Sequence, residues 1–185
     1  MARIYTRTGD DGTTGRIGGK RVSKDSPSVE ACGSLDELNA VLGVVRSHAL
    51  PDSVDKILQL VQDHLFTIGA ELATPEGAER RSKELGDEEI RLLENEIDAL
   101  EDSLPALREF VLPGGVVAGA ELHFARAVAR RAERHCVSLT RLEKINPKIL
   151  CYLNRLSDLC FVLARYVNRQ QSVPESHPTF GKPRA

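Results

Sequence analysis

The stretch IRLLENEIDALEDSLP, residues 90–105, decides the fold class. Its apolar residues recur at spacings of three, four, three and four, which is the repeat of one face of an α-helix. These residues are Ile90, Leu93, Ile97, Leu100 and Leu104. Because a proline lacks the backbone N–H that a helix interior needs, the stretch predicts an amphipathic helix that ends before Pro105.

The same repeat occurs on both sides of this stretch. Upstream, it predicts one helix that starts near Gly33 or Ser34 and ends by Pro51, and a second that is capped by Asp52 or Ser53. Downstream, it predicts helices over about 117–139 and 147–169. Helices of similar length with short connections predict an all-α fold, a five-helix up-and-down bundle formed by residues 28–170.

The two ends of the chain have a different composition. Residues 6–19 hold five glycines and four threonines without helical or strand periodicity, so residues 1–27 are predicted to form a Gly/Thr-rich N-terminal loop. Prolines 174, 178 and 183 follow the last apolar repeat, and residues 171–185 are predicted to form a flexible tail. The 185 residues are expected to form a single domain.

Composition excludes several classes of protein. The chain is 41% hydrophobic and 28% charged, which is ordinary for a globular protein. No apolar run approaches the roughly 20 residues that a membrane helix needs. A net charge of −2 gives no electrostatic argument for a nucleic acid or an anionic membrane as partner.

Cysteine and histidine usage gives two further expectations. Three of the four cysteines lie within apolar repeats, where a reduced, buried thiol is expected, and the N-terminus has no hydrophobic signal region. A cytoplasmic location is therefore predicted. The five histidines show no metal-ligand spacing, so no metal site built by the chain's own residues is expected.

The strongest polar pattern lies in LHFARAVARRAERH, residues 122–135. Arg126, Arg130 and Arg134 are four residues apart and share one helical face, on which Glu133 also lies. Guanidinium groups in a row repel one another unless an anion lies across them, and their planar shape suits phosphate or carboxylate. A charged surface or ion pairs between subunits would explain the same pattern, so it does not decide the function alone.

Three weaker signals leave similar alternatives open. Asn154, Ser157 and Asp158 interrupt an apolar helix, and a neighbouring helix or a ligand could satisfy them. The Gly/Thr-rich segment could be an anion-binding nest or a flexible N-terminus, and it lacks the sequence of a P-loop. Phe110, one of only five phenylalanines, stands before a Pro-Gly-Gly turn, where it could cap the bundle or cover a flat ligand.

Taken in order, five motifs resemble the cob(I)alamin adenosyltransferases of the PduO type. They are IYTRTGDDGTTG, GSLDELNA, FVLPGG, LHFARAVARRAER and YLNRLSD, spread from about Ile4 to Arg169. The resemblance implies a ferritin-like bundle that assembles as a homotrimer, with ATP sites between adjacent subunits. It implies transfer of the 5′-deoxyadenosyl group of ATP to the cobalt of cob(I)alamin, with release of triphosphate and with Mg²⁺ bound. Because cobalamin supplies the nucleophile, no catalytic Ser, Cys or general base is then needed.

The resemblance also assigns roles to individual residues. Asp36 and Arg126 match a salt bridge between subunits, and Phe110 matches the aromatic residue that excludes a ligand from the lower face of the corrin. The residues that match ATP contacts are Thr6, Arg7, Thr8, Gly9, Thr14, Gly15, Lys24, Arg130, Arg131, Glu133, Arg134, Asn154 and Ser157. Residues 16–19 and Ser23 depart from the family's pattern, which leaves the contacts of this loop open.

Two other functions compete with this interpretation. One is a regulatory bundle that binds ATP without alkyl transfer, and the other is a helical scaffold whose arginines form interface ion pairs. An aromatic residue for the lower corrin face separates the enzyme from the first, and phosphate-binding loop residues separate both from the second. The enzyme is further expected to make transient contact with a cobalamin reductase and with an adenosylcobalamin-dependent mutase.

Overall fold

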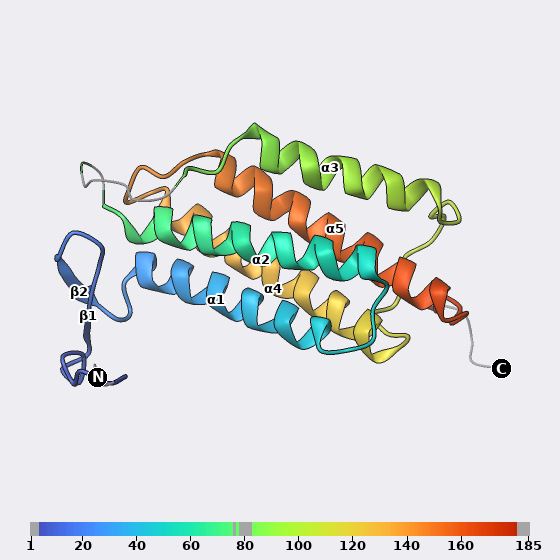
Figure 1. Cartoon of the computed structure of the whole chain (residues 1–185), viewed down its shortest axis with the longest axis horizontal. Coiled ribbons are helices and arrows are strands. Elements are labelled where there is room, and N and C mark those ends of the chain that lie inside the picture. The colour runs from blue at the N-terminus through green and yellow to red at the C-terminus, as the bar shows by residue number, and fades with distance from the viewer. Residues whose placement is uncertain (1–3, 76, 78–82, 181–185) are drawn as a thin grey trace.

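Five helices make up most of the chain in the computed structural model, which describes residues 4–75, 77 and 83–180. They are α1 (Pro27–Arg46), α2 (Asp52–Ala73), α3 (Asp87–Asp102), α4 (Val117–Leu139) and α5 (Lys148–Gln170). Successive helices alternate in direction along the long axis of the molecule (Figure 1). Among them, α5 packs against α4 and α3, and α1 packs against α4 and α2. The predicted all-α five-helix bundle is confirmed.

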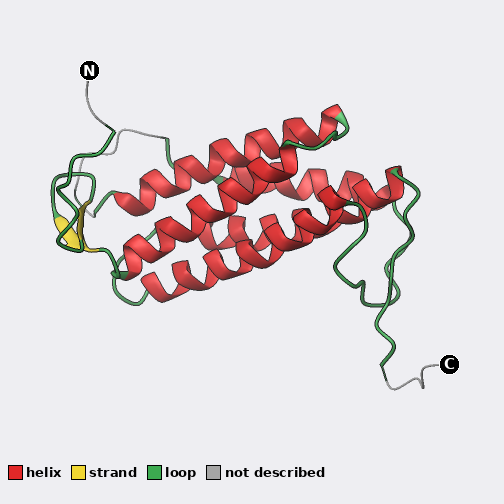
Figure 2. Ribbon diagram, turned by 90° about the horizontal axis from the view of Figure 1, so that it is seen from below, coloured by secondary structure: helices red, strands yellow, loops and turns green. Residues whose placement is uncertain are grey.

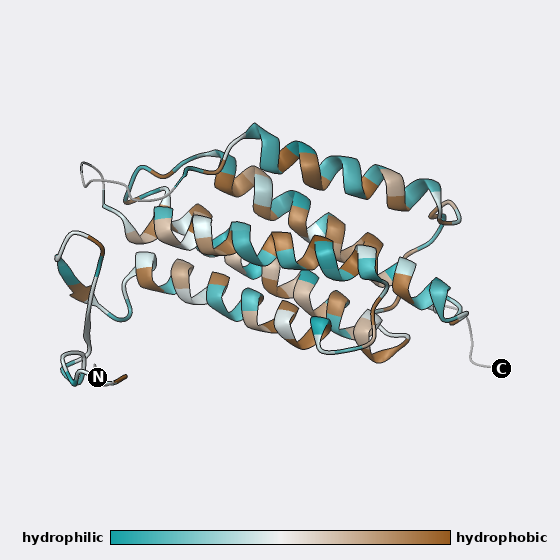
Figure 3. Cartoon of the chain, viewed as in Figure 1, coloured by the Kyte–Doolittle hydropathy of each residue, from teal (hydrophilic) through white to brown (hydrophobic). Residues whose placement is uncertain are grey.

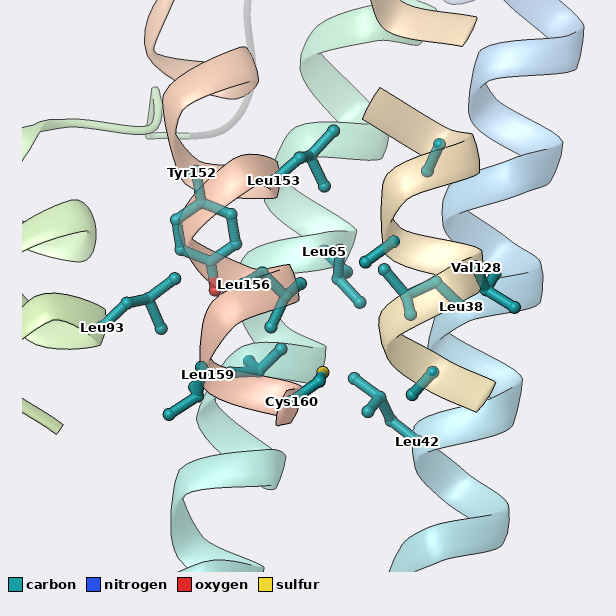
Figure 4. Close-up of a cluster of buried hydrophobic side chains, with 14 of the residues drawn as sticks. Leu38, Leu42, Leu65, Leu93, Val128, Tyr152, Leu153, Leu156, Leu159 and Cys160 are labelled. Carbon is teal, nitrogen blue, oxygen red and sulfur yellow. The ribbon is translucent and has the colours of Figure 1, made fainter. Parts of the chain in front are cut away.

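The core lies between the apolar faces of these helices. Each helix alternates apolar and polar residues along its length (Figure 3), and the apolar ones meet in one buried cluster. Leu38 of α1, Leu65 of α2 and Leu93 of α3 are all fully or almost fully buried there. They surround a row of residues from α5 that includes Leu156 and Cys160 (Figure 4). No helix in the described part of the chain combines the length and apolar character of a membrane span.

The four cysteines are all free, but they differ in burial. Cys136 and Cys160 are buried in the core, and Cys32 is half-buried. Burial raises the pKa of the Cys136 and Cys160 thiols to about 12, so both stay protonated. Cys151 is exposed on α5, although it lies within an apolar repeat. The free thiols agree with the predicted reduced state. The exposure of Cys151 does not agree with the expectation that the cysteines of the apolar repeats are buried.

Two helix starts differ from the sequence prediction. Helix α1 begins at Pro27, not near Gly33, because a proline fits the first position of a helix, where no backbone N–H is needed. Ser28 and Ala31 are buried in this added turn, so the apolar face begins before the leucine repeat. Helix α2 begins at Asp52 with Pro51 at the capping position, so neither Asp52 nor Ser53 is its cap.

The N-terminal segment contains a small antiparallel hairpin that composition did not predict. Its strands are β1 (Thr13–Gly15) and β2 (Arg21–Ser23), coloured yellow in Figure 2. Three residues are too few to show the two-residue alternation of a strand. Gly18 and Gly19 both have positive φ, which lets the chain turn between the strands.

The C-terminal segment is attached to the rest of the molecule as far as residue 180. The Leu112 N–H donates to the carbonyl of Ser176 over 2.7 Å, and the buried Arg165 pairs with Glu175 over 2.5 Å. The segment therefore runs beside the α3–α4 connection (Figure 2). Within the predicted tail, Glu175 and Ser176 thus contact the rest of the molecule, and residues 181–185 lie outside the described part of the chain. The flexibility of the tail stays a prediction.

The start of α3 carries a carboxylate whose ionised form is stabilised by hydrogen bonds. The N–H of Gly86 donates to Glu89 over 2.8 Å, and the Lys83 ammonium lies 2.9 Å from the other oxygen. Burial alone would raise the pKa of Glu89, but the bonds from Lys83 and the backbone outweigh it and lower the pKa to about 2. This interaction satisfies one of the free N–H groups at the helix start.

Glu89→Gln is expected to lower the free energy of unfolding at pH 7 by about 0.5–2 kcal/mol, the usual range for a lost helix cap. A pKa that is lower in the folded state stabilises the fold above the ordinary pKa of 4.5 and ceases to do so as the pH falls toward 2. The difference from the wild type should therefore shrink between pH 5 and about pH 2, as measured by urea unfolding at fixed protein concentration. Glu88→Gln, beside it on the exposed surface, is the control, and a pH-independent difference would contradict this account.

Candidate functional site

Two arginines of α4 that form no ion pair with a carboxylate, among the described residues, face a surface cavity. Arg130 and Arg134 are exposed, and no salt bridge to either occurs in the part of the chain that the structure describes. Arg134 instead donates to the carbonyl of Arg130 over 3.0 Å. The cavity has a volume of about 440 Å³ and is lined by Arg130, Glu133, Arg134, Val137, Ser138 and Arg141. Three cations around one carboxylate make it suitable for an anion.

The other two arginines of residues 122–135 have different surroundings. Arg131 forms an ion pair with Glu37 on α1. Arg126 is half-buried, and its Nε has no hydrogen-bond partner among the described residues. It lies near the buried His123, whose pKa is lowered first by burial and then by the charge of Arg126. Of the four arginines in residues 122–135, Arg130 and Arg134 thus line the cavity, and Arg126 and Arg131 do not.

Asn154 of α5 does not line the cavity itself but contacts Glu133, which does. Its Nδ2 donates to Oε1 of Glu133 over 3.3 Å, which joins α5 to α4 at the cavity wall. Ser157 is buried, and its hydroxyl donates to the carbonyl of Asn154 over 2.8 Å. Asp158 is exposed and lines a separate groove between α3 and α5. Of this polar patch, only Asn154 has a side chain that contacts a residue of the cavity.

The N-terminal loop forms a compact turn in front of α1. The hydroxyls of Thr6 and Thr8 lie 2.8 Å apart, and Arg7 between them has a positive φ of 61°. Lys24 packs against Gly9, where an added Cβ would come within 3.3 Å of the ammonium nitrogen. Thr14 and Gly15 follow on strand β1. This turn and the C-terminal end of α4 lie at the same end of the bundle (Figure 1).

Phe110 lies in the α3–α4 connection, at the opposite end of the bundle. Its side chain is 77% exposed and makes an edge-on contact with Phe180, with 6.3 Å between the ring centres. Nδ1 of His177 lies within hydrogen-bond distance, 2.9 Å, of the Phe110 carbonyl. Such exposure favours a surface role for the ring over a role in closing the core.

The turn after Phe110 is fixed by Asn168, a buried residue of α5. Its amide accepts from the N–H of Val116 over 3.0 Å and donates to the carbonyl of Gly114 over 2.9 Å. Gly115 has a φ of +105°, and a Cβ there would lie 2.1 Å from Asn168 Oδ1. A glycine is therefore needed at position 115 for the turn itself.

Asp36 and Arg126 are not paired within the chain. Asp36 is exposed on α1, beside a groove of about 310 Å³ between α1 and α2. The described residues show no salt bridge between these two, although both match the predicted pair between subunits. The residues matched to one functional site thus lie at separate places on a single chain.

Comparison with known proteins assigns the family. The family model described as cobalamin adenosyltransferase matches residues 4–167. The chain belongs to this family.

The similar proteins and solved structures match this chain over most of its length. The corrinoid adenosyltransferase of Bacillus subtilis (strain 168) is 42% identical over 175 residues, which are 92% of this chain and 89% of that protein. The corrinoid adenosyltransferase PduO of Salmonella typhimurium is 44% identical over 163 residues, and the match spans only 48% of its length. A variant PduO-type ATP:corrinoid adenosyltransferase from Lactobacillus reuteri, solved with cobalamin and ATP, matches with a TM-score of 0.91 and 38% identity, covering 96% of this chain and 99% of that one.

Arg16 is a residue of this family member that the sequence analysis did not single out. Its side chain is 9% exposed, forms an ion pair with Glu143 over 2.7 Å, and donates to the carbonyl of Leu72 over 3.0 Å. The N–H of Ile17 also donates to the carbonyl of Ala73. These contacts fasten the hairpin to the bundle, and a single arginine among glycines was the only signal in the sequence.

Proposed function

We propose that this chain is an ATP:corrinoid adenosyltransferase, which transfers the 5′-deoxyadenosyl group of ATP to cob(I)alamin. In this reaction a Co–C bond forms while the C5′–O bond of ATP breaks, and triphosphate leaves with the electron pair. The observation that carries the proposal is the pair Arg130 and Arg134, which face a cavity without a carboxylate partner in a member of this family. The N-terminal segment 1–27 serves as the ATP-binding loop.

The cations of the cavity suit the triphosphate. Arg130 and Arg134 line the cavity. Lys24 directly follows β2, which lies at the same end of the bundle as the C-terminal end of α4 (Figure 1). Arg141 also lines the cavity. Several cations are needed because the leaving group gains charge as the bond to C5′ breaks.

Mg²⁺ is proposed to enter with ATP. The described part of the chain contains no group of three or more His, Cys, Asp or Glu residues that could hold a metal ion. Glu133 is the one carboxylate among the residues that line the cavity. Since Mg²⁺ is usually held by one or two carboxylates together with substrate phosphates, Glu133 and the triphosphate fit this ion.

Anaerobic incubation of the protein with ATP and chemically reduced cob(I)alamin tests the proposed reaction. The absorbance of cob(I)alamin should disappear and that of adenosylcobalamin should appear, with one triphosphate released for each transfer. Folded protein that binds ATP but leaves the cob(I)alamin spectrum unchanged would instead indicate a regulatory ATP-binding bundle. Failure to bind ATP would indicate a helical scaffold.

A homotrimer with ATP sites between subunits is the proposed assembly. It is supported by Asp36 and Arg126, which have no ion-pair partner among the described residues and match an intersubunit pair of the family. Reduced thiols support a reducing compartment such as the cytoplasm. A cobalamin reductase and an adenosylcobalamin-dependent mutase are the proposed transient partners.

Asp36→Asn is expected to weaken both assembly and activity, because it leaves the partner's arginine without a counter-charge. If the pair is partly buried, this costs up to about 3–5 kcal/mol. The exchanged variant, Asp36→Arg with Arg126→Asp, should recover part of the loss. Sedimentation at micromolar concentration measures assembly, and a monomeric wild type would contradict the trimer.

A further inference from the structure

A chain of three hydrogen bonds leads from α3 to the wall of the Arg130–Arg134 cavity. Oε1 of Glu94 on α3 accepts from Nε of Arg155 over 3.0 Å. Nη1 of Arg155 donates to Oδ1 of Asn154 over 3.2 Å. Nδ2 of Asn154 donates to Oε1 of Glu133 over 3.3 Å. Helix α3 packs against α5, so Arg155 is the route by which one of its side chains influences Asn154.

The chemistry of the two neighbours fixes the orientation of the Asn154 amide. A guanidinium group has only donors, so Arg155 can bind only the amide oxygen. The Glu133 carboxylate has only acceptors, so it can bind only the amide nitrogen. A flipped amide would place two donors together on one side and two acceptors together on the other. Asn154 therefore has one N–H group left over as a donor.

Arg155 is itself held in place by carboxylates on two helices. Besides the bond to Glu94, its Nη1 lies 3.8 Å from Asp158, one turn further along α5. Its side chain is about one-third exposed, and it lines the α3–α5 groove rather than the Arg130–Arg134 cavity. Arg155 is thus separated from the nucleotide cavity by Asn154.

We propose that Arg155, held by Glu94, is a positioning residue that makes Asn154 present an N–H donor, and not its carbonyl oxygen, to an acceptor of the nucleotide. The inference rests on the proposed function, in which ATP occupies the cavity beside Asn154. It extends that function by giving α3 a part in nucleotide binding and by fixing the hydrogen-bond polarity of this contact.

A double-mutant cycle tests the coupling between the two residues. The variants are Asn154→Ala, Arg155→Met and the double variant, and the measurement is the Kd for ATP by calorimetry without cobalamin. Arg155→Met should weaken ATP binding roughly five- to thirtyfold, within the usual range for coupled members of one hydrogen-bond network. In the Asn154→Ala background it should have no further effect. The KM for cob(I)alamin should change in none of the three.

A matched pair on α3 tests the anchor. Glu94→Ala and Asp98→Ala each remove one carboxylate from the wall of the α3–α5 groove, but only Glu94 contacts Arg155. Glu94→Ala should weaken ATP binding about three- to tenfold, and Asp98→Ala by less than about twofold. Equal effects would mean that overall charge acts instead of positioning, and would overturn the proposal.

The outcomes separate this inference from the proposed function. If Asn154→Ala weakens ATP binding and Arg155→Met weakens it further in that background, the proposed function stands and the positioning role is wrong. If Asn154→Ala leaves ATP binding unchanged, the proposed contact between Asn154 and ATP is itself wrong, and the positioning role is wrong with it. Thermal unfolding of every variant identifies any loss that is due to misfolding.

Discussion

Arg130→Ala is expected to lower kcat/KM for ATP about ten- to hundredfold, because one charge-assisted hydrogen bond contributes roughly 1.5–3 kcal/mol. Both constants should change: KM should rise because bound triphosphate loses a cation, and kcat should fall because the leaving triphosphate gains charge in the transition state. Arg130 has no carboxylate partner in the described part of the chain, so its removal leaves no charge unpaired. Steady-state kinetics under anaerobic conditions, followed by the loss of cob(I)alamin absorbance, measures both constants.

The control for this prediction is chosen from the structure. Arg141 follows the motif in sequence and would serve by that criterion, but it lines the same cavity as Arg130. Arg141→Ala should therefore have a measurable effect, smaller than that of Arg130→Ala. Arg91 is exposed on α3 and is the better control, with an expected change of less than about twofold. Equal losses from Arg91→Ala and Arg130→Ala would mean that Arg130 acts only through the net charge of the protein and not through a contact with ATP.

The helices could be predicted because each has a clear apolar repeat. The repeat that begins at Ile90 runs through α3 as far as Leu100, and its last residue, Leu104, lies just beyond the end of the helix at Asp102. The break at Pro113-Gly114-Gly115 precedes α4. The start of α1 was predicted too late because its first turn is made of small and polar residues, which carry no leucine repeat. The hairpin was missed because its strands are three residues long.

The spacing of the arginines predicted which of them share a face, but not what each contacts. Glu37, which pairs with Arg131, lies on another helix almost a hundred positions earlier in the chain. Arg155 was missed because its partner Glu94 lies on α3, 61 positions earlier in the chain, and reaches it only when α3 packs on α5. Contacts of this kind leave no local periodicity, so a single sequence does not reveal them.

The same reason explains the segment after α5. Its prolines and polar residues are typical of a loose tail, yet Glu175 forms an ion pair with the buried Arg165. Arg165 also donates to the carbonyl of Pro105 over 2.8 Å, so one guanidinium holds the C-terminal segment and the start of the Phe110 connection together. The position of Phe110 thus depends on residues at the far end of the sequence.

Phe110→Ala is expected to reduce adenosylation most strongly when the reaction starts from cob(II)alamin. Forming Co(I) requires a very low potential, which is hard to reach while a ligand occupies the lower face of the corrin. If the ring of Phe110 excludes that ligand, its loss should slow the reaction more than about tenfold, which corresponds to roughly 1.4 kcal/mol of activation free energy. Pre-reduced cob(I)alamin should restore much of the rate, since the reduction step is then bypassed.

The structure makes this variant a clean test of the ring. Phe110 is 77% exposed, so its removal leaves no cavity in the core. Its backbone is held through its carbonyl by His177, and the turn beyond it is held by Asn168; neither contact involves the ring. The connection should therefore keep its position, and the thermal stability of the variant should stay close to that of the wild type.

Two measurements then separate a corrin contact from a structural role. ATP binding should be nearly unchanged, because Phe110 belongs to the α3–α4 connection, which lies at the opposite end of the bundle from the C-terminal end of α4 (Figure 1). Spectra of the variant with ATP and cob(II)alamin should show mostly five-coordinate cobalt where the wild type shows a four-coordinate fraction. ATP binding that falls in proportion to activity, or a large drop in melting temperature, would show that the ring stabilises the fold and does not act on the corrin. Because the ring is exposed and the connection is held by backbone contacts, we expect ATP binding and thermal stability to be kept while the five-coordinate spectrum appears.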